Sequence, residues 1–367
     1  GNPTIAAKAV TSGDIEGTSL TVTWKSKAVV VPSFFASDMV LQQNMPINVW
    51  GTGISGSTVS VSLNGETKSC PVTNGKWSVA LSGLAADCVT QYTMTVSDNT
   101  GFHESFTNVM MGEVWVCGGQ SNMERSMYSD GDYSTEQPIA NYPNLRFFTQ
   151  ESNPSATEQV DVKNGKWAVC TPANLGMFSA VGYYFGKEIH LSQDVPVGMV
   201  SAYVGGTMVA SWISKNAIEG NPALAAYKTN TANETGSRLQ NGLYNGMVKP
   251  LMPLSVKGVV WYQGESDASY GLLYEQLLTT LITSWRNEWN NQDIDFQIVQ
   301  IPNYASADWQ GVREGQYRAV KKLDKAALTV TIDLGDPNDV HPKYKKDVGY
   351  RLGLSARKLT YHENIGT

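Results

Sequence analysis

The pattern of apolar residues changes near residue 107, and this change limits the possible folds more than any other feature of the chain. Between residues 29 and 107, short β-rich segments alternate apolar and polar residues, as in VSVSL (59–63), and Gly, Asn, Asp or Pro separate them. Short alternating strands at this spacing are typical of an antiparallel β-sandwich. We therefore expect residues 1–107 to form an antiparallel β-sandwich of the jelly-roll type.

Two local signals add detail to this part of the chain. The pair Asn74-Gly75 lies between two strand-like segments and predicts a tight hairpin turn. Residues 19–24 (SLTVTW) alternate weakly and predict a short edge strand.

After residue 107, continuous apolar segments alternate with amphipathic stretches. The apolar segments, each short enough for a buried strand, are 113–119, 195–206, 256–263, 296–302 and 327–335. The amphipathic stretches, each long enough for a helix, are 181–192, 273–289, 312–323 and 346–360. This alternation predicts an α/β domain at residues 108–367, with a parallel sheet that helices cover on both faces.

Charge and cysteine content exclude several classes of partner and cofactor. Lys and Arg number 27 and Asp and Glu number 33, which gives 27 − 33 = −6 and argues against nucleic acid or an anionic membrane as partner. No apolar run reaches the length of a membrane span.

The four cysteines form no CxxC pair and no HExxH occurs, so we expect no metal and no cofactor. Cys70 and Cys88 flank a strand–turn–strand segment, which is compatible with one disulfide or with two free thiols.

Four loops that follow predicted strands are candidates for one common site. They are residues 118–124, 203–207, 261–268 and 333–342. In parallel sheets, sites lie beyond the carboxyl ends of the strands. His341 is the one histidine of four that lies in such a loop, so it is the candidate general base, with helix capping as the structural alternative.

Two serines compete as the nucleophile. Ser121 lies between a strand and an expected helix start, after Gly118 and Gly119, which allow a tight turn. Ser266 lies in GESDA, which differs from the GxSxG nucleophile elbow at Ala268. The spacing slightly favours Ser121, and the structural alternative for either serine is a helix N-cap.

Three groups can form an oxyanion hole beside the nucleophile. Gln263 ends an apolar strand and carries a neutral amide donor, and Gly205 or Gly206 can expose a backbone N–H. Together with the Ser121 N–H they would supply three donors. The structural alternative is a tight turn and a core amide with internal partners.

Aromatic and basic residues near these loops give weaker signals. Trp115, Trp212 and Trp261 flank the loops and offer flat faces for sugar rings, although most of the 10 tryptophans must be core residues. The segment KYKK (343–346) predicts the solvated face of a basic helix rather than an anion site.

Five blocks taken in order resemble the sialate O-acetylesterase family of the SGNH (GDSL-like) hydrolases. The blocks are GEVWVCGGQSNME, YVGGT, LYNGMVKPL, WYQGESDA and DLGDPNDVHP, and the likeness extends over about residues 29–360. The resemblance implies a three-layer α/β/α esterase domain in which Ser121 is the nucleophile and His341 the general base. It also implies oxyanion donors from the Ser121 N–H, Gly206 (with Gly205 as the alternative) and Gln263.

Two positions depart from the pattern of the wider superfamily. Asn338 stands where Asp often precedes the histidine by three residues, and an amide cannot stabilise an imidazolium by charge. Asp339 or Asp336 then completes the triad, or a backbone carbonyl orients His341 in a Ser-His dyad, and we favour Asp339. Gln263 replaces the Asn that usually occupies the third block.

The candidate residues favour a serine hydrolase, and the resemblance implies a carbohydrate O-acetylesterase that acts on O-acetylated sialic acid. The alternatives are an acetylxylan esterase and a non-catalytic glycan-binding protein. A sialate carboxylate needs a basic partner, for which Arg125 and Arg313 are the candidates. Low charge, the β-rich part and the resemblance predict an exported bacterial-type protein, periplasmic or at the cell surface.

Overall fold

The computed structural model describes residues 5–7, 20–22, 29–305 and 307–366. Strand β1 (Ile5–Ala7) pairs antiparallel with β2 (Leu20–Val22). The strand predicted at 19–24 is thus found at residues 20–22, and its remaining residues lie outside the described ones. No helix among the described residues is long and apolar enough to cross a membrane.

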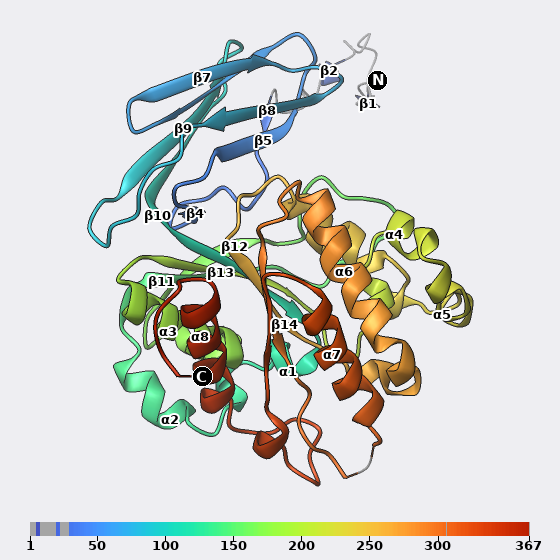
Figure 1. The fold of residues 1–367 in the computed structure, drawn as a ribbon. Coiled ribbons are helices and arrows are strands. Elements are labelled where there is room, and N and C mark those ends of the chain that lie inside the picture. The colour runs from blue at the N-terminus through green and yellow to red at the C-terminus, as the bar shows by residue number, and fades with distance from the viewer. Residues whose placement is uncertain (1–4, 8–19, 23–28, 306, 367) are drawn as a thin grey trace, which may run out of the picture.

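Two small antiparallel sheets form the first part of the chain (Figure 1). One consists of β3 (Val29–Val30), β5 (Ile47–Gly53) and β8 (Lys76–Leu81). The other consists of β7 (Glu66–Pro71), β6 (Thr58–Leu63), β9 (Tyr92–Asp98) and the beginning of β10 (His103–Gly119). Alternate residues of β6 and β8 are buried, as the sequence predicts. Asn74 and Gly75 have φ of 52° and 77° in the turn before β8, which confirms the hairpin.

Strand β10 continues from the antiparallel part into the parallel sheet. It pairs with β9 through Val109, with β4 (Val40–Gln42) at residues 110–112, and with the parallel sheet from residue 113. Residue 107, where the sequence pattern changes, therefore lies inside one strand. The division into domains 1–107 and 108–367 stays a prediction.

The parallel sheet has β10 at its centre. Its order is β12 (Lys166–Cys170), β11 (Tyr142–Thr149), β13 (Val197–Tyr203), β10, β14 (Gly258–Tyr262), β15 (Asp295–Val299) and β16 (Ala326–Thr329). Only β12 runs antiparallel to its neighbour. The five strands predicted after residue 107 are confirmed, whereas β11 and β12 were not predicted. β11 contains the buried Arg146, whose guanidinium donates to the Asn108 carbonyl. This charged residue interrupts the apolar run by which a buried strand is predicted from the sequence.

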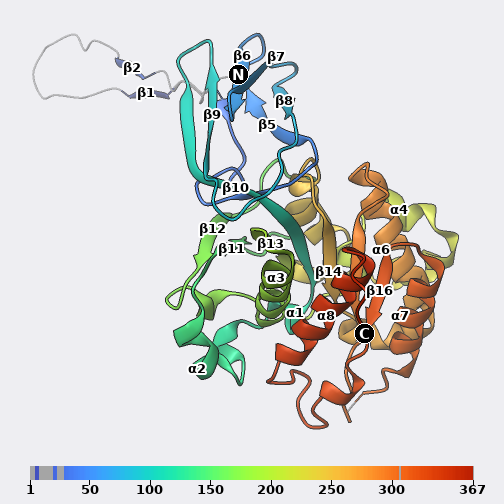
Figure 2. The same ribbon diagram turned by 60° about the vertical axis from the view of Figure 1, so that its left-hand side comes forward.

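Four longer helices cover the sheet and confirm the predicted helical stretches. They are α3 (Ala180–Gln193), α6 (Tyr274–Glu288), α7 (Gln310–Lys322) and α8 (Lys346–Leu359). α3 packs against α8 and α6 against α7, and the two pairs lie on either side of the sheet (Figure 1, Figure 2). Shorter helices are α1 (Ser121–Glu124), α2 (Tyr133–Glu136), α4 (Lys215–Gly220) and α5 (Ala225–Asn230).

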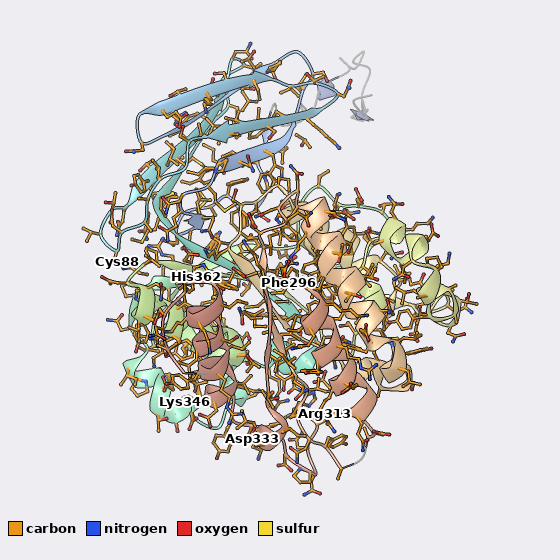
Figure 3. All side chains as sticks on the ribbon, viewed as in Figure 1. Cys88, Phe296, Arg313, Asp333, Lys346 and His362 are labelled. Carbon is orange, nitrogen blue, oxygen red and sulfur yellow. The ribbon has the colours of Figure 1, made fainter. Side chains whose placement is uncertain are left out.

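The structure answers two of the open questions from the sequence. Cys70 and Cys88 are free thiols, so the disulfide is not formed. Cys88 instead lies beside the α/β part, with its Sγ 3.4 Å from the Asp194 carbonyl (Figure 3).

All three candidate sugar-binding tryptophans, Trp115, Trp212 and Trp261, are fully buried and belong to the core.

Candidate active site

The carboxyl ends of three neighbouring strands meet at the start of α1. Gly119 at the end of β10 pairs with Tyr203 of β13 and with Tyr262 of β14. Gly119 has φ of +136°, and a Cβ at this position would collide with the Tyr262 carbonyl. Only glycine fits this approach, and the chain turns directly from it into α1, of which Ser121 is the first residue.

Ser121 and His341 are in hydrogen-bond contact although 220 residues separate them. The Ser121 Oγ lies 2.8 Å from the His341 Nε2. Ser266, the competing serine, has no hydrogen bond to a histidine in the described part of the chain, and its backbone N–H donates to the Gln120 Oε1 at 3.2 Å. A serine nucleophile requires a base within hydrogen-bond distance, so the geometry favours Ser121.

The surroundings of His341 favour its neutral form. Burial lowers the pKa of His341, and the positive charges of Arg125 and Lys345 lower it further, while Asp339 opposes them. A general base must be unprotonated to accept the serine proton. The imidazole is therefore prepared to act as a base at neutral pH.

The aspartates of the histidine loop hold its backbone. Asp339 Oδ1 accepts a hydrogen bond from the His341 backbone N–H at 2.8 Å, and Asp336 Oδ1 accepts one from the Asn338 N–H at 2.8 Å. Within residues 29–305 and 307–366, the Nδ1 of His341 has no hydrogen-bond partner. Which group completes a triad stays a prediction.

Asn122 links three segments of the site, and the sequence did not reveal this role. Its side chain is fully buried. Its Nδ2 donates to Glu265 Oε1 at 2.6 Å and to the Val340 carbonyl at 3.0 Å, and its Oδ1 accepts from Lys345 Nζ at 2.7 Å. Because Val340 precedes His341, this one amide fixes the histidine loop relative to α1. Its position directly after Ser121 is the only sequence signal for it.

Lys345 lies inside the protein, so the prediction that KYKK (343–346) is a solvated face is wrong at this position. Its residue is 2% exposed, and burial lowers the pKa of Lys345 to about 8. The Asn122 Oδ1 accepts from the ammonium at 2.7 Å, and the negative charges of Glu265 and Asp130 favour the charged form, which together offset the cost of this burial. The amino group also lies over the Tyr262 ring, 5.7 Å from its centroid.

The two candidate glycines differ in whether their N–H is available. The Gly205 N–H donates to Glu124 Oε2 at 2.6 Å and is therefore occupied. Gly206 is exposed and has φ of +71°, and its N–H has no partner among the described residues. A Cβ on Gly205 would lie 3.4 Å from the Ser121 Cβ, so this loop adjoins Ser121. The Ser121 N–H likewise has no partner in the described ranges.

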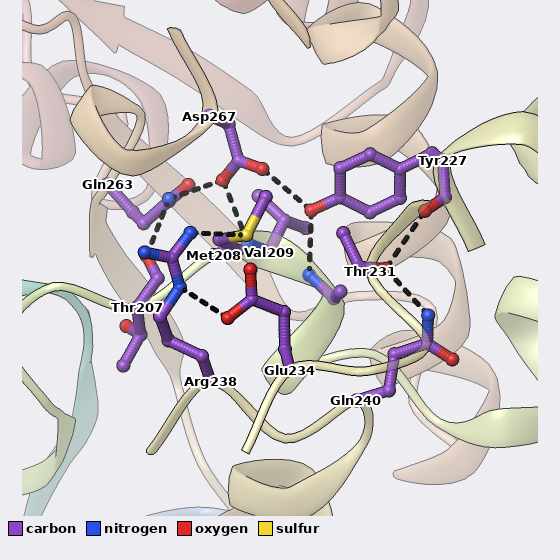
Figure 4. A network of polar contacts seen from close by, with 11 residues as sticks. Thr207, Met208, Val209, Tyr227, Thr231, Glu234, Arg238, Gln240, Gln263 and Asp267 are labelled. Carbon is purple, nitrogen blue, oxygen red and sulfur yellow. Dashed lines mark hydrogen bonds and ion pairs between the residues drawn. The ribbon is translucent and has the colours of Figure 1, made fainter. Parts of the chain in front are cut away.

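Gln263 is fully buried, and its amide is hydrogen-bonded to neighbouring side chains and to the backbone (Figure 4). Its Nε2 lies 3.1 Å from Gln120 Oε1, 3.1 Å from the Thr207 carbonyl and 2.7 Å from Asp267 Oδ2. Two amide hydrogens thus serve three acceptors, which leaves none for a substrate in this arrangement. These contacts match the alternative of a core amide with internal partners, and a donor role for Gln263 stays a prediction.

Asp267 lies beside Gln263 and joins it to the loop that follows Gly206 (Figure 4). This fully buried carboxylate also accepts from the Val209 N–H at 2.9 Å and from the Tyr227 hydroxyl at 2.6 Å. Burial raises the pKa of Asp267, and its three donors oppose that change. Gln263 and Asp267 together therefore hold the loop that carries Gly206.

We expect Gln263→Ala to lower both the stability and the turnover of the protein. The substitution leaves the buried Asp267 carboxylate without one donor, which costs about 1–3 kcal/mol of unfolding free energy. Urea unfolding and kcat for acetate release measure the two effects. Gln240→Ala is the matched control, because Gln240 lies in the same region but does not touch Asp267 (Figure 4). Reduced turnover with unchanged unfolding would instead show that Gln263 donates directly to the substrate.

Comparisons with known proteins agree with this chemistry. A family model described as carbohydrate esterase, sialic acid-specific acetylesterase matches residues 111–355. Sialate O-acetylesterases from Homo sapiens and Mus musculus are each 29% identical and align over 93% and 90% of this chain, and 74% and 73% of their own length. The crystal structure of a carbohydrate acetylesterase from Xanthomonas citri is similar with a TM-score of 0.83 and 33% identity, over 92% of this chain and 76% of that one.

Proposed function

Since the chain belongs to the carbohydrate esterase family of sialic acid-specific acetylesterases, we propose that it removes O-acetyl groups from sialic acids. Ser121 is the nucleophile in this proposal and His341 the general base. The observation that carries these roles is the 2.8 Å contact between Ser121 Oγ and His341 Nε2 at the carboxyl ends of the central strands.

The proposed reaction is a two-step acyl transfer. His341 accepts the proton of Ser121 while the Ser121 Oγ attacks the acetyl carbonyl. The backbone N–H groups of Ser121 and Gly206 stabilise the oxyanion. The sugar hydroxyl leaves with the proton from His341. Water then attacks the acetyl-enzyme in the same way and releases acetate. The reaction requires no metal and no cofactor.

Other residues position these groups. Asp339 holds His341 through its backbone N–H and contributes negative charge, and Asn122 holds the preceding residue. Gln263 supports the glycine loop through the Thr207 carbonyl. It becomes a third oxyanion donor only if substrate binding frees one of its hydrogens.

The finer features of the fold belong to the same proposal. We assign residues 108–367 to a three-layer SGNH-type esterase domain and residues 1–107 to a jelly-roll-like β-sandwich. The central parallel sheet with helices on both sides and the two antiparallel sheets support this division. The low content of charged residues, 16%, and the β-rich part support export to the periplasm or the cell surface.

The substrate is tested by acetate release from an O-acetylated sialic acid and from acetylated xylo-oligosaccharides. We expect kcat/KM to be at least about tenfold higher for the sialic acid, which corresponds to about 1.4 kcal/mol of transition-state binding. The reverse order would favour an acetylxylan esterase. No release from either substrate, together with binding of the glycan, would favour a non-catalytic glycan-binding protein.

A further inference from the structure

Arg125 occupies a fixed position one helical turn after the nucleophile. Its backbone N–H donates to the Ser121 carbonyl at 2.8 Å, and its own carbonyl accepts from the Ala180 N–H at 2.9 Å. The side chain is half-buried. The backbone of Arg125 is thus held between α1 and the beginning of α3.

The charge of the Arg125 guanidinium acts on the reacting groups. Among the residues that the structure describes, the guanidinium makes no hydrogen bond and no ion pair. Its charge is nevertheless close enough to lower the pKa of both His341 and Lys345. The buried ammonium of Lys345 adds a second positive charge to the same region.

The carboxylates of this region already have protein donors. Glu124 accepts from the Gly205 N–H, Asp130 from the Lys345 N–H, Glu265 from the Asn122 side chain and Asp339 from the His341 N–H. A half-buried guanidinium without a counter-ion is costly, and it attracts an anion that can offset its loss of hydration.

We propose that Arg125 binds the carboxylate of the sialic acid while the acetyl group lies at Ser121. The planar guanidinium can donate two parallel hydrogen bonds to a carboxylate, which gives orientation as well as affinity. Neutral sugars such as acetylated xylose lack this group. Arg125 would therefore select anionic sugars over neutral ones, and this inference rests on the proposed esterase function.

Arg313, the other basic candidate, is already engaged. It lies on α7, and its Nη1 donates to the Pro302 carbonyl at 3.2 Å (Figure 3). Arg313→Gln is therefore the matched control for the loss of one arginine charge.

The test compares an O-acetylated sialic acid with its carboxamide. In the carboxamide an uncharged amide, which is not an ester, replaces the carboxylate. We expect the parent enzyme to prefer the acid by about 10- to 100-fold in kcat/KM. Arg125→Gln should bring this ratio close to one. Arg125→Lys keeps the positive charge but cannot donate two parallel hydrogen bonds, so it should give an intermediate ratio. Arg313→Gln should keep the ratio of the parent enzyme.

Three results would overturn the inference, and they are distinguishable. Equal kcat/KM of the parent for acid and carboxamide would show that no carboxylate is recognised, although the esterase function would stand. A ratio that survives in Arg125→Gln but falls in Arg313→Gln would place recognition at Arg313. If the parent released acetate from neither compound, nor from acetylated xylo-oligosaccharides, the proposed function itself would fail.

Discussion

Ser121→Ala should lower kcat for acetate release by at least about 10³-fold, the order of loss seen when a serine nucleophile is removed from a serine hydrolase. The Oγ is hydrogen-bonded to His341 and to no other side chain in the described residues, so its loss removes the attacking atom and one hydrogen bond. The thermal unfolding midpoint should therefore stay close to that of the parent. Acetate release from an O-acetylated sialic acid measures the effect.

Ser266→Ala is the matched control for this substitution. Its hydrogen bond to Gln120 is donated by the backbone N–H, which alanine retains, so turnover should stay close to the parent value. Full activity in Ser121→Ala together with a loss in Ser266→Ala would exchange the roles of the two serines.

His341→Ala should lower kcat to a similar extent, because the serine proton then has no acceptor. His103→Ala provides the control, since His103 lies in the antiparallel part of β10 and contacts Ser105. A His341→Ala variant that keeps parent turnover would exclude the proposed base.

The pH dependence of the parent enzyme tests the same histidine. The base must be neutral, so kcat/KM rises as the pH passes upward through the pKa of His341. Burial and the neighbouring cations lower that pKa, so the acidic limb should have its midpoint below the ordinary histidine value of about 6.5. A midpoint above this value would mean that Asp339, or another carboxylate, controls the imidazole more strongly than the cations do.

The sequence predicted the central elements of the fold because they obey local patterns. β13, β14, β15 and β10 from Val109 onward are buried on both faces, and in the sequence they appear as mainly apolar segments. The loops after such strands lie at one edge of the sheet. The sequence therefore predicts that Ser121 and His341 share one site.

The parts that the sequence did not predict depend on contacts between distant segments. Lys345 stands in a basic segment typical of a solvated surface, and its burial depends on the Asn122 amide, 223 residues away, and on the nearby carboxylates of Glu265 and Asp130. The internal partners of Gln263 likewise come from separate loops, so its amide could not be distinguished from a free donor. The disulfide between Cys70 and Cys88 was compatible with their spacing, but Cys88 instead lies beside the end of α3.

The most direct test of the account is to treat the enzyme with a fluorophosphonate, which labels activated serines, and then to measure acetate release and map the labelled peptide. We predict that release from an O-acetylated sialic acid stops in proportion to labelling and that the label is on Ser121. A label on Ser266, or acetate release that continues when Ser121 is fully labelled, would contradict the account.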